Sequence, residues 1–200
     1  MLACGAVLLA ALGGCGREDA VPVDEVSSDH GLIVLPAPRE IVIPPLLAQD
    51  GGPFAHDALL GKWSFVFFGY ASCPDICPLT MATLRDAERE LADERFQAVF
   101  VSVDPERDTL EAIGAYLTAF SSRFVGVTGE EGELRRFGLE LAAGFMRTPA
   151  PDGVPADRYL VDHSGHVAIV DPEGRFVAIL KDPRRGEYVV EAFRTLAGRA

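Results

Sequence analysis

The sequence predicts a single α/β domain in which helices flank a mixed central sheet. Three observations support this fold class. A chain of 200 residues with 48% hydrophobic and 24% charged residues can bury one sizeable core. Short apolar runs suited to buried strands alternate with segments of helical periodicity. The chain then ends on a hairpin signal and an amphipathic helix, which adds antiparallel strands to the expected sheet.

The first elements of the predicted domain are two buried strands joined by a helix. Residues 41–43 are a short strand candidate ahead of them. Residues 63–68 form a continuous aromatic-rich run, which is typical of a central strand buried on both faces. Residues 79–91 have apolar positions at an approximately helical spacing, and residues 96–103 predict the second buried strand.

The remaining elements follow from capping and turn signals. Capping-box patterns at residues 108–111 and 128–131 predict helices running to about Phe120 and Phe137. A turn signal at residues 171–174 predicts a hairpin between two strands. The last strand candidates and the C-terminal helix occupy residues 159–161, 167–170, 176–180 and 187–196.

The N-terminal segment predicts export and a lipid anchor. The apolar run at residues 2–12 is too short to span a bilayer but suits a signal peptide, although no basic residue precedes it. It ends at Leu12-Gly13-Gly14-Cys15, which resembles a bacterial lipobox. We therefore expect residues 1–14 to be a lipoprotein signal peptide, against the alternative of a buried apolar segment with an incidental Cys15.

Residues 15–38 are then expected to be an acylated Cys15 and a flexible tether, because Asp, Glu, Ser and Pro recur there with little periodicity. Residues 39–200 are the folded domain. The predicted protein is an exported bacterial lipoprotein, held to a membrane through its lipid and facing the periplasm or the cell exterior. The formal net charge of -12 argues against nucleic acid as a partner, because such a surface repels phosphate.

Two cysteines remain as free thiols once Cys4 is cleaved away and Cys15 is acylated. Cys73 and Cys77 lie where a central strand ends and a helix begins, and a helix N-terminus favours thiolate and lowers the pKa of a cysteine. Their spacing puts both sulfurs on one face, one turn apart. The pair is therefore suited to a redox disulfide, to chelation of one soft metal ion, or to a passive structural clip.

A histidine completes a three-ligand set that suits copper, whereas a structural zinc site lacks its fourth ligand. His30 in the tether and His56 near a surface turn are expected to be solvated. His163 and His166 lie just before a strand expected in the same sheet as the cysteine-bearing strand. The default role of a lone histidine there is a hydrogen-bonded structural one, so the residues leave its ligation open.

Three separate segments resemble the signature segments of the Sco/SenC family, and the similarity runs from about residue 38 to residue 196. The matching segments are Gly69-Tyr70-Ala71-Ser72-Cys73-Pro74-Asp75-Ile76-Cys77-Pro78, Val101-Ser102-Val103-Asp104-Pro105-Glu106-Arg107-Asp108-Thr109 and Tyr159-Leu160-Val161-Asp162-His163. Three motifs in the right order are far more specific than a lone cysteine pair.

The resemblance implies a thioredoxin-like fold and a site in which Cys73, Cys77 and His163 bind copper, as Cu(I) or Cu(II). It also implies maturation of the dinuclear copper centre of cytochrome c oxidase, with the copper-bearing oxidase subunit as partner and another periplasmic copper chaperone as a further candidate partner. Asp162 matches the acid beside the family's histidine, with a supporting or docking role. Arg107 is a weak candidate for partner contact, and His166, outside the family pattern, is expected to be an exposed strand residue.

Two functions compete on the same residues. The first is a metallochaperone that passes copper on by ligand exchange. The second is a thiol-disulfide oxidoreductase in which Cys73 and Cys77 are the redox pair that reduces the cysteines of the oxidase copper site. A peroxiredoxin-like activity is disfavoured, because Tyr70 stands where a Thr or Ser is expected three positions before the cysteine.

Overall fold

An eight-stranded mixed sheet forms the centre of the computed structural model, which describes residues 31–150, 152–153 and 155–198. The strand order is β1-β10-β9-β4-β5-β6-β2-β3. In chain order these strands are β1 (Leu32–Glu40), β2 (Leu46–Ala48), β3 (Pro53–Phe54), β4 (Trp63–Gly69), β5 (Phe96–Ser102), β6 (Val125–Thr128), β9 (Val167–Val170) and β10 (Arg175–Leu180). Strands β4, β5 and β6 are parallel, and the remaining neighbours are antiparallel, so the prediction of a mixed sheet is confirmed.

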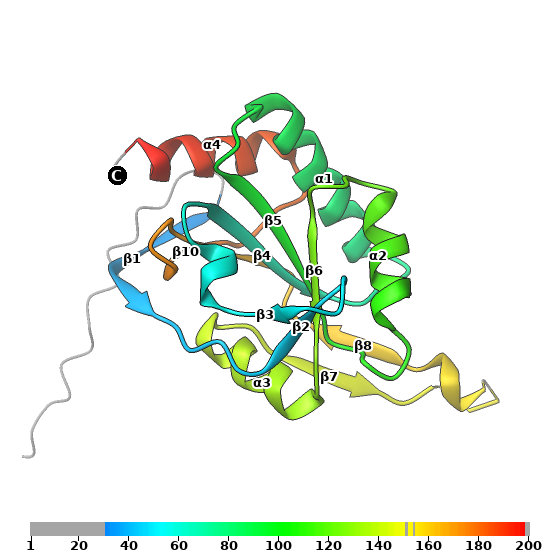
Figure 1. The fold of residues 1–200 in the computed structure, drawn as a ribbon. Helices are drawn as coiled ribbons and strands as arrows, with labels where there is room; N and C mark the ends of the chain where they lie inside the picture. The colour runs from blue at the N-terminus through cyan, green and yellow to red at the C-terminus, as the bar shows by residue number, and fades with distance from the viewer. Residues whose placement is uncertain (1–30, 151, 154, 199–200) are drawn as a thin grey trace, which may run out of the picture.

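Four α-helices cover the sheet (Figure 1). They are α1 (Ile76–Leu91), α2 (Leu110–Thr118), α3 (Glu131–Glu140) and α4 (Gly186–Ala197), and two 3-10 turns, η1 (His56–Leu59) and η2 (Ala156–Arg158), complete the helical elements of the described residues. Ring contacts assign the helices to faces. On one face Phe96 contacts Phe193 of α4 and Phe100 contacts Tyr116 of α2, whereas Phe68 on the opposite face contacts Phe137 of α3.

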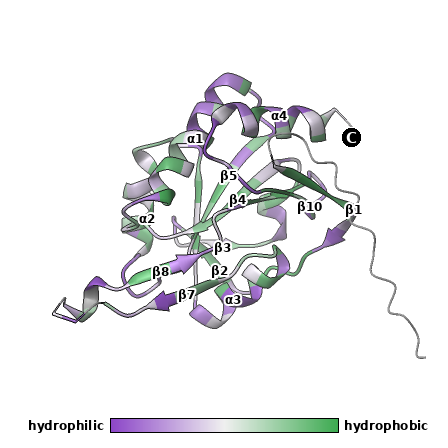
Figure 2. Cartoon of the chain, turned by 180° about the vertical axis from the view of Figure 1, so that it is seen from behind, coloured by the Kyte–Doolittle hydropathy of each residue, from purple (hydrophilic) through white to green (hydrophobic). Residues whose placement is uncertain are grey.

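The core lies on the central strands. Every residue of β4 is buried, because this strand is covered by helices on both faces. Figure 2 shows apolar residues gathered on the strands and hydrophilic ones over the outer surfaces of α1, α3 and α4. Among the described residues, no helix is long and apolar enough to cross a membrane.

The third matching segment ends in a small sheet of its own. Strands β7 (Phe145–Thr148) and β8 (Leu160–His163) form an antiparallel pair with Phe145 opposite His163, and this pair is not hydrogen-bonded into the eight-stranded sheet. Figure 1 shows the two strands running side by side, apart from the strands of the main sheet. We refer to residues 145–163 as the ribbon.

The predicted start of the folded domain is wrong. Residues 32–38, assigned to the tether, belong to β1, which pairs with β10 and buries Leu32. Pro36 and Pro38 obscured the strand pattern, and proline is tolerated there because β1 is an edge strand whose register shifts between Val34 and Arg39. The strand predicted at residues 41–43 is also wrong, since this segment connects β1 to β2. The signal peptide, Cys15, His30 and the tether up to residue 30 lie outside the described residues.

Two capping predictions also need correction. Thr109 is the N-cap of α2 and its side chain accepts a hydrogen bond from the Ala112 amide, so the helix begins one residue later than the predicted box, and Asp108 points into the protein. Thr128 is the last residue of β6 and donates to the Ser102 carbonyl oxygen instead of capping α3.

Candidate metal centre

Cys73 and Cys77 lie where the central strand passes into α1. Strand β4 ends at Gly69, a short loop carries Cys73, and Cys77 is the second residue of α1. The buried Cys77 side chain packs under the helix, whereas Cys73 is partly exposed. A Cβ on Gly69 would stand only 2.8 Å from Cys77 Sγ, so the absence of a side chain at residue 69 leaves the space that this sulfur occupies.

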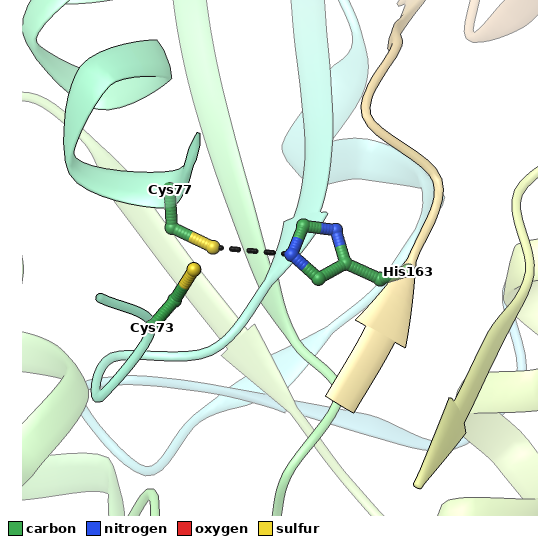
Figure 3. Close-up of side chains that lie close together, drawn as sticks. All are labelled: Cys73, Cys77 and His163. Carbon is green, nitrogen blue, oxygen red and sulfur yellow. Dashed lines mark hydrogen bonds between the residues drawn. The ribbon is translucent and has the colours of Figure 1, made fainter. Parts of the chain in front are cut away.

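His163 approaches the two thiols from the ribbon. As the last residue of β8 it points at the cysteines from the opposite side (Figure 3). Its Nε2 lies 3.3 Å from Cys77 Sγ. The donor atoms of Cys73, Cys77 and His163 all lie within 4.8 Å of one another, so the structure brings the three sequence-predicted residues together.

The neighbours of His163 select its tautomer. Its Nδ1 lies 3.1 Å from the carbonyl oxygen of Ser164. A carbonyl oxygen only accepts hydrogen bonds, so Nδ1 carries the proton and Nε2 presents a lone pair to the thiols. Burial lowers the pKa of the imidazole, which is therefore neutral at pH 7 and free to act as a nitrogen donor.

Two aromatic rings fix the imidazole plane. Phe67 and Tyr70 meet it edge-on, with ring centroids at 5.7 Å and 5.9 Å. Sequence reasoning did not assign either residue to the site. Tyr70 stands three positions before Cys73 in the first matching segment, and Phe67 shares its face of β4 with Gly69. Their positions along the chain could therefore have assigned both residues to the site.

The expected lowering of the pKa by the helix N-terminus is wrong for Cys77. Burial raises the pKa of its thiol, and the neighbouring Cys73 raises it further. Loss of water around a fully buried sulfur raises the thiol pKa by more than the helix dipole lowers it. Cys77 is therefore a protonated thiol at neutral pH until a metal ion or a reaction partner displaces its proton.

The other histidine and acid predictions have mixed outcomes. Among the described residues His56 and His166 stand outside the cysteine group. His166 is half-buried just before β9 and burial lowers its pKa, so the prediction of an exposed strand residue is wrong. His56 is also only partly exposed, because its ring packs against Gly174. The Asp162 carboxylate accepts a hydrogen bond from Thr148 at 2.7 Å, and the Ser164 carbonyl is the partner of His163 Nδ1.

The donor set fits a soft metal ion. Ligand bonds of about 2.0–2.3 Å keep two donors of one ion within about 4.6 Å of each other, so the arrangement needs only a small contraction. Two sulfurs and one imidazole nitrogen favour copper over magnesium or calcium, which prefer oxygen. An open hollow lined by Gly144, Phe145, Met146, Asp162, His163 and Ser164 gives access from the surface beside the imidazole.

The SCO1/SenC family profile matches residues 45–198. A curated protein of Stutzerimonas stutzeri whose name describes copper binding is 36% identical over 155 residues, covering 75% of this chain and 74% of that protein. The mitochondrial SCO2 protein of Saccharomyces cerevisiae is 37% identical over 134 residues, 66% of this chain, but the chain spans only 44% of its length.

Solved structures agree with the fold. The crystal structure of copper-bound ScoI from Arabidopsis thaliana is 29% identical with a TM-score of 0.69, covering 82% of this chain and 98% of that one. The structure of BsSco is 19% identical with a TM-score of 0.54, covering 78% of this chain and 93% of that one, and so is similar in fold alone. BsSco is described as having a disulfide switch and as a member of the Sco family of cytochrome c oxidase assembly proteins. The predicted thioredoxin-like fold is confirmed by these Sco neighbours.

Proposed function

This chain belongs to the SCO1/SenC family, and from that premise we propose that it binds one copper ion through Cys73, Cys77 and His163 and delivers it to, or prepares, the dinuclear copper centre of cytochrome c oxidase. The observation that carries the proposal is the convergence of the three donor atoms within 4.8 Å of one another. The copper-bearing oxidase subunit is the proposed partner, and another periplasmic copper chaperone is a further proposed partner.

The burial of the ligands supports handover from one side. Cys77 is fully buried, whereas Cys73 and His163 are partly exposed and His163 borders the open hollow. An incoming thiolate therefore reaches the ion past Cys73 and His163. Ligand exchange begins with these two donors, and Cys77 keeps the ion until the acceptor site has supplied its own ligands.

A second candidate function is reduction of a disulfide in the oxidase subunit. Cys73 and Cys77 are both free thiols, and their sulfurs lie within 4.8 Å of each other. In such a reaction the two thiols lose two electrons and two protons, and the partner disulfide takes them up to become two thiols. The partly exposed Cys73 would attack first, and the buried Cys77 would then release the mixed disulfide.

Copper binding by single-residue variants separates the two candidates. Cys73→Ala and Cys77→Ala are expected to abolish tight Cu(I) binding, because each leaves only two ligands. His163→Ala is expected to weaken it and to alter the sulfur-to-copper absorption of the Cu(II) form. His166→Ala is the matched control, because it also removes a half-buried imidazole, but one that lies outside the cysteine group. If His163→Ala binds Cu(I) and Cu(II) as tightly as the parent does, the thiol-disulfide reductase becomes the better-supported function.

We also propose that the protein is an exported lipoprotein anchored through Cys15, so that the site faces the periplasm or the cell exterior. The support is the apolar run at residues 2–12 followed by the lipobox-like Leu12 to Cys15.

A further inference from the structure

The segment from Asp104 to Asp108, which links β5 to α2, lies beside the proposed copper site and has no role in it so far. Asp104 is completely buried, and Arg107 forms an ion pair with it through Nε. The Arg107 guanidinium also lies flat against Tyr159, with Cζ 3.7 Å from the ring centroid. Burying a carboxylate together with its paired cation costs desolvation free energy. We therefore expect this cluster to have a role other than that of a solvated surface ion pair.

This segment contacts the cysteine loop. Asp108 accepts a hydrogen bond of 2.7 Å from the amide of Ala71, two residues before Cys73. The Arg107 guanidinium lies 5.4 Å from the ring centroid of Tyr70, and the same ring meets the imidazole of His163. The loop that carries the first thiol is thus attached to residues 104–108.

The same segment contacts the strand that carries His163. Arg107 Nη1 donates a hydrogen bond of 3.0 Å to the carbonyl oxygen of Tyr159, the residue immediately before β8. The Tyr159 hydroxyl in turn donates to Asp104 at 2.6 Å. Arg107 therefore sits between the two halves of the site.

Side-chain contacts have to align the cysteine loop with β8, because these two segments are not neighbours in one hydrogen-bonded sheet. In the described part of the chain, β8 pairs only with β7, and neither belongs to the sheet that contains β4. Arg135 of α3 ties the other strand of the ribbon by donating a hydrogen bond of 3.0 Å to the Phe145 carbonyl oxygen. Arg107 connects the ribbon to the cysteine side, alongside the Tyr159 hydroxyl bonded to Asp104 and the ring contact between Tyr70 and His163.

We propose that Arg107 is a positioning residue that sets the distance between the His163 imidazole and the two thiols. The inference rests on the proposed copper site. A planar guanidinium can pair with a carboxylate, donate to a carbonyl and stack on a ring at the same time, which the ammonium of a lysine cannot do. Arg107→Lys is therefore expected to keep the charge but lose the alignment.

The matched control is Arg147, which approaches the same Tyr159 ring at 4.3 Å. Its ion-pair partner is Glu106, and both side chains are exposed. Arg147→Met thus removes a cation from the same aromatic ring without touching Asp104. Exposed pairs of this kind contribute little, so copper affinity within about twofold of the parent is expected.

The first measurement uses the reduced, copper-free protein. Nuclear Overhauser contacts between the imidazole of His163 and the ring of Tyr70 should be present in the parent and in Arg147→Met. They should be lost or weakened in Arg107→Met and Arg107→Lys. Unchanged contacts in both Arg107 variants would overturn the proposal. This readout needs no copper, so it decides the positioning role even if the parent fails to bind copper and the proposed function falls.

The second measurement is Cu(I) affinity in a double-mutant cycle. Arg107→Met should weaken binding by about 10- to 100-fold, the usual effect of removing a group that orients a metal ligand. In a His163→Ala background the same substitution should have little further effect, because its influence passes through the imidazole. An equal loss in both backgrounds would mean that Arg107 acts on the cysteines or on the whole fold, and the proposal would be wrong.

If Arg107→Met does not fold, Arg107→Lys carries both measurements, because it keeps the positive charge and loses only the planar guanidinium. Tyr159→Phe then tests the neighbouring contact, since it removes the hydroxyl group that donates to Asp104 and keeps the ring that Arg107 covers. A weaker affinity of Arg107→Lys supports the proposal if the loss is absent in the His163→Ala background. A parent-like affinity of Arg107→Lys together with a parent-like contact between His163 and Tyr70 overturns it.

Discussion

Cys77 lies in surroundings that oppose its ionisation. Burial raises the pKa of the thiol, so the proton remains bound at neutral pH, whereas copper requires the thiolate. Copper binding must therefore release the Cys77 proton. Because burial lowers the imidazole pKa, His163 is already neutral at pH 7 and adds no proton release there.

Copper affinity is expected to rise with pH. The Cys77 proton alone contributes about a tenfold increase in affinity for each pH unit below its raised pKa. Calorimetric titration with Cu(I) in buffers of different ionisation enthalpy, between pH 6.5 and 8.5, counts the protons released. His163→Ala should keep the same slope in this range, since its imidazole is not a proton source. An affinity independent of pH would show that Cys77 is already ionised in the metal-free protein.

Gly69 is the second residue whose chemistry can be tested. An added Cβ would lie 2.8 Å from Cys77 Sγ and about as close to the rings of Phe67 and Phe100. Gly69→Ala is therefore expected to destabilise the fold by about 1–3 kcal/mol and to weaken copper binding by moving the sulfur. Unfolding by denaturant measures the first effect and Cu(I) competition the second.

Gly132 in α3 is the control for this substitution, because a Cβ there meets nothing within 4 Å. Gly132→Ala should leave copper affinity unchanged and stabilise the protein by up to about 1 kcal/mol, since alanine is the better helix former. Equal stability of the two variants would mean that the space around Cys77 is larger than the structure indicates.

Residue patterns predicted the cysteine pair but not its complete surroundings. The spacing of Cys73 and Cys77 after an apolar strand located them at a helix start, as the structure has it. The choice of His163 over His166 came from the family resemblance, because no local periodicity specifies which loop returns to the cysteines. The Tyr70 and Arg107 contacts join distant segments, and tertiary contacts of this kind leave no repeating signal in sequence.

At the scale of elements, α1 both bears Cys77 and packs on the sheet. Leu84 on its inner face is fully buried, whereas Leu79 is 55% exposed. Leu84→Ala is expected to destabilise the protein by about 2–5 kcal/mol through the cavity it leaves. Leu79→Ala should change stability by no more than about 0.5 kcal/mol. Chemical denaturation of both variants provides the measurement, and similar losses would mean that α1 is rotated from the described orientation.

Strands that form apolar runs were predictable, and the short strands of mixed composition were not. Strands β4, β5, β9 and β10 are continuous apolar runs, and their predicted bounds agree with the structure to within one or two residues. The missed strands β2, β3, β6 and β7 span two to four residues each, too few for a period to emerge. β1 was missed because its prolines and charges resemble a linker, and its pairing with β10 outweighs that composition.

At the scale of the whole molecule, attachment to a membrane is the proposal with the largest consequences. If Cys15 is acylated, Cys15→Ser should release the protein from the membrane fraction or leave an unprocessed precursor. Fractionation of cells and the mass of the mature chain measure the two outcomes. Processing and membrane association that match the parent would rule out the lipid anchor, while Cys4→Ser, upstream of the expected cleavage, is the control that should change neither.

The separation of the ribbon from the eight-stranded sheet has an architectural consequence. Strand β9 pairs directly with β4, so the ladder of the main sheet closes without any contribution from β7 or β8. A shortened chain leading from α3 straight into β9 would keep that ladder and both thiols, but it would lose the imidazole together with the buried Phe145, Tyr159 and Val161. The third donor thus comes from a unit outside the main sheet that is held to the core by its own apolar side chains. Grafting such a hairpin onto a thiol-exchange protein would convert a dithiol site into a metal site, if the graft brings these buried residues along with the imidazole.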